Sequence, residues 1–220
     1  MTTLALPRKT LHITALAVPL AGWTLHTTLL RRRLVQARRD PLTSTWRREA
    51  FTDRAQRLLK RHPDEVVLIL ADADHFKQLN DRHGHAAGDT ALAAIGSRLT
   101  EWAGRHGVAG RLGGDEFAAL TPIEPRHQKL RLDHLARLMT RPIPYGDGLL
   151  PLTVSLGAAT PAAIGTTDLP TLMRAADTAM YEGKHTGHIV HARPDHAHMP
   201  SVNGRRQGRP GTTIRTTTGR

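Results

Sequence analysis

The chain has 220 residues, enough for one domain with extensions, and apolar residues make up 39% of it. It contains no cysteine, which excludes disulfides and thiolate metal sites. The formal net charge of +12 indicates an anionic partner, such as a nucleotide, a nucleic acid or an acidic lipid surface. Much of this charge lies in the flanks, at RRRLVQARR (31–39) and in residues 193–220, so it says little about the centre of the chain.

The first predicted element is an apolar segment over residues 11–30, which contains no Asp, Glu, Lys or Arg. Its length is about that of a membrane-spanning helix, and the arginines that follow would place its C-terminal side in the cytoplasm. Histidines, threonines, a proline and a glycine dilute its hydrophobicity, so a helix packed on a partner or on the domain is an equal alternative. Residues 1–39 are thus interpreted as an N-terminal apolar helix, a possible membrane anchor, followed by an Arg-rich linker helix.

A globular pattern follows over residues 40–192. Residues 43–62 have the spacing of an amphipathic helix, and VVLILADAD (66–74) predicts a buried strand. The later elements are predicted as a short helix and loop (75–84), a longer helix (85–107), two short strands around a pair of glycines (108–120), a helix (127–141), a strand (149–160) and a helix (168–187). This order predicts an α+β domain with a single central, mostly antiparallel sheet flanked by helices.

The last predicted segment, residues 193–220, is rich in Arg, Gly, Thr and Pro and has almost no large apolar side chains. Such a composition cannot bury enough surface to offset the entropy of ordering, so it predicts a disordered basic tail. The Arg runs of the chain lack interleaved aromatic residues on which bases could stack, and aromatic residues total only 4%. Nucleic acid is therefore disfavoured as the main partner.

Two acidic clusters carry the chemistry in this pattern. Asp72 and Asp74 end the predicted strand 66–74, and RLGGDEFAAL (111–120) places Asp115 and Glu116 directly after two glycines. If the two strands are neighbours, these carboxylates converge at one end of the sheet, where they need a cation, and hard oxygen ligands suit Mg²⁺. Gly113 and Gly114 have no side chains and would let a bulky anionic substrate approach the backbone. A plain hairpin turn with solvated acids is the structural alternative.

Several ordered motifs resemble one known family. They are DPLT (40–43), LADADHFKQLNDRHGHAAGDTAL (70–92), RLGGDEFAAL (111–120), TVSLGAAT (153–160) and ADTAMYEGKHTGH (176–188). Together they are similar to the GGDEF domain, the catalytic module of diguanylate cyclases, across residues 40–190. The resemblance implies a fold like the palm of nucleotide cyclases and polymerases.

The resemblance also implies an activity. The family condenses two GTP molecules into cyclic di-GMP and releases two pyrophosphates, with one GTP on each domain of a homodimer. By motif position, Asp72, Asp115 and the carbonyl of Ala73 would bind Mg²⁺ or Mn²⁺, and Glu116 would support the metal site. The catalytic domain would then work in the cytoplasm, tethered to the membrane if residues 11–30 span it.

The same motifs assign the substrate contacts. Asn80 and Asp89 would read the guanine edge and Leu42 would line the base pocket, although Asp89 could instead cap its helix. Asp74 is expected to cap the following helix rather than to bind metal.

The phosphates of GTP would contact a second group of residues. Lys77 and Lys184 would hold the β- and γ-phosphates as point charges. The backbone N–H groups of His75 and Phe76, at the start of a helix, would add an anion cradle.

Some positions depart from the family pattern. The family opening usually has Gly-Leu where this chain has Ser44-Thr45, and His188 replaces an arginine of the closing motif. The family's product-inhibition motif, R-x-x-D, would fall at Gly104 and Gly107, so no product feedback through that site is expected. A catalytically weak or inactive GGDEF-like module, which binds GTP and signals by protein interaction, is the alternative to an active enzyme.

Overall fold

The computed structural model describes residues 23–24, 26–30, 36–184 and 188–199. It divides the chain into two units, Met1–Arg39 and Asp40–Arg220. In the first unit, residues 26–30 are helical, and the hydroxyl of Thr28 donates to the carbonyl of Thr24 (2.7 Å). No helix in the described part of the chain is long and apolar enough to cross a membrane, and most of residues 11–30 lie outside it.

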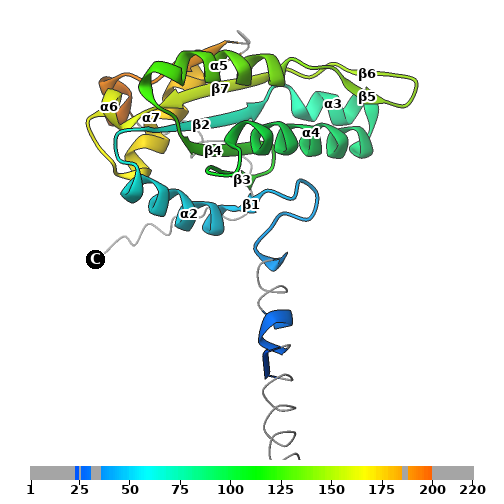
Figure 1. Ribbon diagram of the computed structural model, residues 1–220. Helices are drawn as coiled ribbons and strands as arrows, with labels where there is room; N and C mark the ends of the chain where they lie inside the picture. Colours follow the sequence, from blue (N-terminus) through cyan, green and yellow to red (C-terminus); the bar gives the residue numbers. More distant parts are fainter. Residues whose placement is uncertain (1–22, 25, 31–35, 185–187, 200–220) are drawn as a thin grey trace, which may run out of the picture. The chain divides into compact units, whose positions relative to one another are not determined.

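The second unit alternates short strands with amphipathic helices (Figure 1). In chain order its elements are β1 (Trp46–Arg47), α2 (Arg48–Arg61), β2 (Val66–Ala73), α3 (Phe76–His83), α4 (His85–Ala103), β3 (Val108–Gly113), β4 (Glu116–Pro122), α5 (Pro125–Met139), β5 (Ile143–Tyr145), β6 (Gly148–Leu150), β7 (Val154–Ala159), α6 (Pro161–Ile164), α7 (Leu169–Glu182), β8 (Ile189–His191) and the 3₁₀ helix η1 (Pro194–His198).

The main sheet has six strands in the order β1-β3-β4-β2-β7-β8. The three central pairs are antiparallel, whereas the two edge pairs, β1 with β3 and β7 with β8, are parallel. The α+β fold with a mostly antiparallel sheet is thereby confirmed. The sheet is not the only one in the described residues, because β5 and β6 form a separate two-stranded hairpin.

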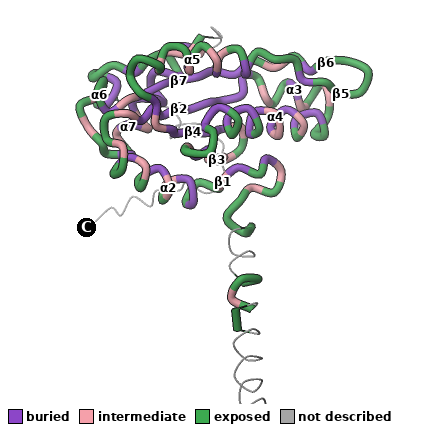
Figure 2. Tube along the Cα trace, in the orientation of Figure 1, coloured by how far each residue is buried: buried purple, intermediate pink, exposed green. Residues whose placement is uncertain are grey.

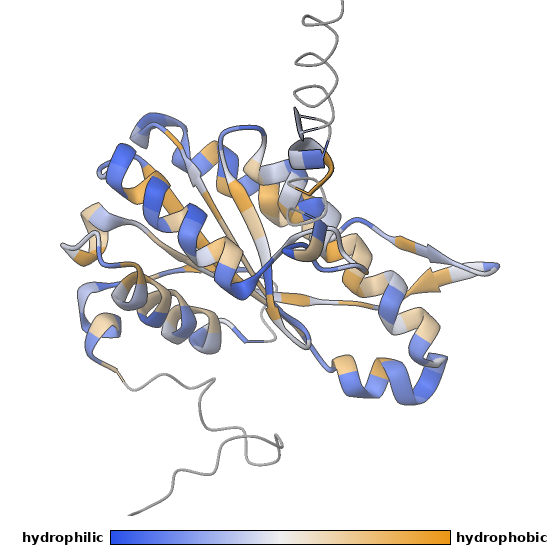
Figure 3. Cartoon of the chain, turned by 90° about the horizontal axis from the view of Figure 1, so that it is seen from below, coloured by the Kyte–Doolittle hydropathy of each residue, from blue (hydrophilic) through white to orange (hydrophobic). Residues whose placement is uncertain are grey.

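Helices cover both faces of the sheet, and the alternation of strand side chains sorts the core into two layers. Odd-numbered residues of β2, such as Ile69, pack with α4 and α5, whereas even-numbered ones, such as Leu68, pack with α2 and α7. All eight residues of β2 are buried as a result. Figure 2 shows this buried centre in purple beneath exposed outer turns, and Figure 3 shows apolar residues gathered on the strands while the helices alternate between polar and apolar faces.

Several element boundaries differ from the sequence prediction. The helix predicted over 43–62 begins at Arg48, because Trp46 and Arg47 pair with β3 as an edge strand. The strand predicted over 149–160 is two strands, β6 and β7, which belong to different sheets.

The prediction of a disordered tail from residue 193 is wrong for residues 193–199. Residues 194–198 form η1, in which His196 has 0% and Ala197 has 5% exposure. Ala197 joins the core layer between the sheet and α7. Residues 200–220 lie outside the described part of the chain.

Candidate active site

The register of the central strands places two buried carboxylates side by side. β2 pairs with β4, and Asp72 stands directly opposite Glu116. Asp72 is 1% exposed and Glu116 is 6% exposed. Asp115 lies at the turn just before β4, and its carbonyl accepts a hydrogen bond from the N–H of Ala73 (3.3 Å). The two acidic clusters therefore meet at one end of the sheet.

Strand alternation also decides which helices face these carboxylates. Asp72 continues the even-numbered set of β2, which packs against α2 and α7. One cation at the start of α2 and another just beyond the end of α7 each lie beside a carboxylate there. Lys184, just beyond α7, donates from Nζ to Oδ2 of Asp72 (3.0 Å), and Nη2 of Arg48, the first residue of α2, lies 3.8 Å from Oε2 of Glu116. Burial of a carboxylate is costly without such a partner.

Asp74 does not cap α3, so this expectation was wrong. The N-cap position of α3 is His75, which makes no side-chain capping bond. Asp74 is instead buried, and its Oδ1 accepts a hydrogen bond from the hydroxyl of Ser155 on β7 (2.7 Å). Asp74 thus ties the end of β2 to its neighbour β7.

The glycine pair forms the tight connection between β3 and β4. Gly114 has φ 51°, in the left-handed region that favours glycine. Its carbonyl accepts two hydrogen bonds from the guanidinium of Arg111, at 2.9 and 2.7 Å, and Arg48 donates from Nε to the carbonyl of Leu112 (2.9 Å). Backbone geometry thus explains Gly114, while space for a nucleotide beside the pair stays a prediction.

Arg111 also links the turn to the start of the domain. Its Nη1 lies 3.2 Å from Oδ1 of Asp40, which in turn accepts hydrogen bonds from the backbone N–H and the hydroxyl of Thr43. Burial raises the pKa of Asp40, but the hydrogen bonds from Thr43 and Arg111 outweigh it, so the pKa lies below its ordinary value. Neither Arg48 nor Arg111 was assigned a role from the sequence, although Arg111 stands only two residues before the glycine pair.

The residues assigned to the guanine base lie on and around α3 and α4. Oδ1 of Asn80 is buried and has no hydrogen-bond partner among the described residues. Gly88 of α4 lies against it, and a Cβ added at Gly88 would collide with Oδ1 of Asn80 and lie 3.1 Å from the ring of Phe76. Asp89 is exposed on α4 one residue later, and it does not cap that helix, whose N-cap is Gly84.

Leu42 and Phe76 are partly buried and pack against the core layer that contains α4. Phe76 is the first residue of α3 and follows the N-cap residue His75, whose φ of 53° lies in the left-handed region. Lys77 is exposed on the first turn of α3. Lys184 contacts Asp72, a partner that the resemblance did not assign to it.

The donors around Asp72 fit a hard divalent cation in type. They are the carboxylates of Asp72 and Asp115 and a backbone carbonyl, all oxygen ligands. Among the described residues, no group of three or more His, Cys, Asp or Glu side chains is arranged to hold a metal ion. A metal at this site would therefore need ligands beyond these side chains, and Mg²⁺ commonly takes them from substrate phosphates and water.

The comparisons with known proteins agree with this geometry. The family described as "Diguanylate cyclase, GGDEF domain" matches residues 37–189. The chain belongs to the GGDEF family. A protein of Streptomyces ambofaciens, "Uncharacterized 19.3 kDa protein in repSA 5'region", is 48% identical over 171 residues, which cover 77% of this chain and 91% of that protein.

Other GGDEF proteins are similar over the same region. The diguanylate cyclase TpbB of Pseudomonas aeruginosa PAO1 is 37% identical over 68% of this chain, which spans 35% of the length of TpbB. The coiled coil and GGDEF domain of DgcB from Caulobacter crescentus, solved in complex with c-di-GMP, has a TM-score of 0.64 at 28% identity, covering 81% of this chain and 100% of that one. The isolated GGDEF domain of P. aeruginosa PA1120 has a TM-score of 0.59 at 34% identity, covering 72% and 96%.

Proposed function

We propose that this GGDEF protein is a diguanylate cyclase that condenses two GTP molecules into cyclic di-GMP. In each half-reaction, the 3′-oxygen of one GTP attacks the α-phosphorus of the other. The new phosphorus–oxygen bond replaces the bond to the β-phosphate, so pyrophosphate leaves and the 3′-hydroxyl loses its proton. The observation that carries the proposal is the pairing of Asp72 with Glu116 beside Asp115, at the end of a sheet of this fold.

The carboxylates have the chemistry that such a reaction needs. Asp72, Asp115 and the carbonyl of Ala73 would hold Mg²⁺ or Mn²⁺, and Glu116, anchored by Arg48, would keep the carboxylates in register. When bound, the metal would lower the pKa of the attacking 3′-hydroxyl and neutralise charge on the α-phosphate.

The substrate would lie between the carboxylates and α3. The carboxamide of Asn80 and the carboxylate of Asp89 would bind the guanine edge, since a carboxylate accepts from the ring N–H and the amino group of guanine, a donor pair that adenine lacks. The buried, unpartnered Oδ1 of Asn80 supports this assignment, because such an atom is costly unless a ligand satisfies it. Leu42 would contact the base.

The phosphates would be held by Lys77 and by the backbone N–H groups of His75 and Phe76 at the start of α3. Lys184 would hold them as well, which requires its ammonium group to be shared between Asp72 and the substrate. His188 in place of an arginine would weaken this end of the phosphate site.

A homodimer would be required for turnover, because each domain supplies one GTP. Residues 1–39 would pair the two chains. Trp23 and Leu30 support this role, because both are apolar, exposed and seven residues apart, a spacing that returns to one helix face. The DgcB fragment that resembles this chain also combines a coiled coil with its GGDEF domain.

The test is turnover by the full chain with GTP and Mg²⁺, with products resolved by mass. Wild-type protein should form cyclic di-GMP and pyrophosphate, and Asp115→Ala should not. Asp133→Ala is the matched control, because it removes an exposed carboxylate of α5 that pairs only with its neighbour Lys129 in the described structure. Binding of GTP without conversion by wild-type protein would contradict the proposed enzymatic activity. It would favour a GTP-binding signalling module, the alternative that the departures from the family pattern at His188 and Ser44 support.

A further inference from the structure

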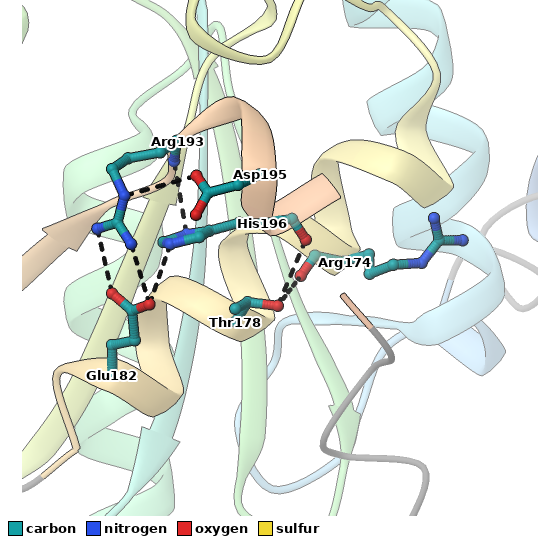
Figure 4. Close-up of polar contacts among 6 residues, drawn as sticks. All are labelled: Arg174, Thr178, Glu182, Arg193, Asp195 and His196. Atoms are coloured by element: carbon teal, nitrogen blue, oxygen red, sulfur yellow. Dashed lines mark hydrogen bonds and ion pairs between the residues drawn. The ribbon is translucent and has the colours of Figure 1, made fainter. Parts of the chain in front are cut away.

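One face of α7 contacts the C-terminal 3₁₀ helix η1 (Pro194–His198). Arg174, Thr178 and Glu182 are spaced four residues apart, so they share this face. Nη1 of Arg174 donates to the carbonyl of Ala197 (3.1 Å), and the hydroxyl of Thr178 reaches the carbonyl of His196 (3.5 Å). Figure 4 shows η1 lying along this face, with Glu182 at its end.

Glu182, the last residue of α7, makes the strongest of these contacts. Its two carboxylate oxygens accept hydrogen bonds from Nη1 and Nη2 of Arg193, at 3.2 and 3.1 Å, a two-pronged geometry that fixes the orientation of both groups. Nε2 of His196 lies 3.1 Å from the same carboxylate (Figure 4). The imidazole of His196 is completely buried. Nδ1 of His196 accepts a hydrogen bond from the N–H of Arg193 (3.4 Å), whereas its buried Nε2 makes no hydrogen bond within the described residues.

Glu182, Arg193 and His196 together form a clamp, and Glu182 stands two residues before Lys184. Helical hydrogen bonds continue through this end, from the N–H of Gly183 to Ala179 and from that of Lys184 to Tyr181. Gly183 is buried against Val190 of β8, with no room for a Cβ. The backbone of Lys184 is therefore positioned by the end of α7, and its side chain reaches Asp72 from there.

We propose that Glu182 is a positioning residue. Held by Arg193 and close to His196, it fixes the end of α7 so that Lys184 contacts Asp72 in the candidate active site. The inference rests on the proposed function for its kinetic consequence. Glu182 and Arg193 are partly exposed, so solvent screens their attraction and the clamp adds little to global stability. The clamp instead affects the position of Lys184, and a displacement of about 1 Å in an active site can lower the rate about a hundredfold.

The experiment compares Glu182→Gln with the matched control Glu124→Gln in the full chain. Glu124 also pairs with an arginine, Arg126, but on the exposed start of α5 away from Lys184. Glu182→Gln should lower kcat/KM for GTP about tenfold, a fraction of the penalty for a 1 Å misplacement, and the control should not change it. Lys184→Ala combined with Glu182→Gln should be no worse than Lys184→Ala alone, because both changes remove the same contact. Arg193→Lys, which keeps the charge but loses the fork, should give an intermediate loss.

Wild-type kinetics from Glu182→Gln, or additive losses in the double variant, would overturn the proposal. A second readout does not depend on turnover. Amide hydrogen exchange at residues 179–184 should accelerate in Glu182→Gln but not in Glu124→Gln, and unchanged protection there would overturn the positioning role even if wild-type protein failed to convert GTP. Failure of conversion with accelerated exchange would instead count against the proposed function alone.

Discussion

Ser44 has a backbone conformation that its side chain disfavours. Its φ is 57°, and it shares the left-handed region with only one other non-glycine residue in the described chain, His75. The GGDEF family usually has glycine at this position, and the structure gives the physical reason, because only glycine adopts this conformation without a steric penalty.

Ser44→Gly should therefore stabilise the protein, by about 0.5–1 kcal/mol, since relief of roughly 1–2 kcal/mol of strain is partly offset by the greater entropy of glycine in the unfolded chain. Urea denaturation measures the difference. Ser44→Ala is the control, because alanine keeps the Cβ and should give no gain. A Ser44→Gly variant that is less stable than wild type would show that the contacts of the serine side chain outweigh the strain.

Asp40 predicts a dependence of stability on pH. Although burial alone would raise the pKa of Asp40, hydrogen bonds from Thr43 and Arg111 lower it below the ordinary 3.8. The folded state thus binds this proton less readily than the unfolded state. The stabilising contribution is complete above the unfolded pKa and is lost as the pH falls through the folded pKa.

Asp40→Asn should destabilise the protein at pH 7, and the difference from wild type should shrink as the pH is lowered below about 4, where wild-type Asp40 also becomes protonated. Urea midpoints at both pH values measure the effect. A destabilisation that is equal at pH 7 and pH 3 would mean that the carboxylate charge of Asp40 has no role.

At the scale of elements, β7 and α7 are in unusually close contact at Gly157. A Cβ there would collide with the carbonyl of Ala176 and lie 2.5 Å from the backbone nitrogen of Met180. Both obstacles belong to the backbone of α7, so they cannot move aside as a flexible side chain would.

Gly157→Ala should destabilise the protein by about 1–3 kcal/mol, the usual cost of overpacking a core. Thermal unfolding measures it, with Gly148→Ala as the control, because a Cβ at Gly148 in the β5–β6 hairpin meets nothing within 4 Å. A displaced α7 would also move Lys184, so the rate of GTP conversion should fall even at temperatures where the variant remains folded. Equal stability of Gly157→Ala and Gly148→Ala would show that β7 and α7 do not pack as closely at Gly157 as described.

Strong periodicity explains which elements the sequence predicted. The apolar run of β2 with its acids predicted one buried strand, and the glycine pair predicted the hairpin of β3 and β4, but neither pattern determined that β4 pairs with β2. A two-residue strand such as β1 carries no period, and η1 is stabilised by partners on α7 distant in sequence. The pair of Lys184 and Asp72 joins residues separated by 112 positions, so only the motif resemblance, and no local pattern, pointed to both.

At the scale of the whole molecule, the division after Arg39 separates the proposed dimerising segment from the GGDEF domain. Deletion of residues 1–39 should abolish turnover in dilute solution while leaving GTP binding intact, because each domain retains its own substrate site. Fusion of an unrelated parallel coiled coil in place of residues 1–39 should restore turnover. Full activity of the truncated protein at nanomolar concentration would show that residues 1–39 are not needed to pair the chains.

Feedback by product is the other property of the whole molecule that the structure bears on. The family's R-x-x-D motif would occupy Gly104 and Gly107, in the connection between α4 and β3. Gly104 has φ 65°, and a Cβ at Gly107 would lie 2.5 Å from the carbonyl of Ala103 and 2.6 Å from Thr121. The backbone has thus adapted to two glycines, and restoring the Arg and Asp side chains would strain it.

Cyclic di-GMP should consequently leave the initial rate of GTP conversion unchanged when it is added at increasing concentration. One feature of the structure opposes this expectation. A cavity of about 340 Å³ beside the same connection is lined by basic side chains, among them Arg57, Arg61 and Arg105, which could bind an anionic product. A saturable fall in rate would therefore contradict the prediction, and its loss in Arg57→Ala and Arg61→Ala would locate the inhibitor in this cavity. An unchanged rate up to saturating cyclic di-GMP would confirm that turnover is not inhibited by its product.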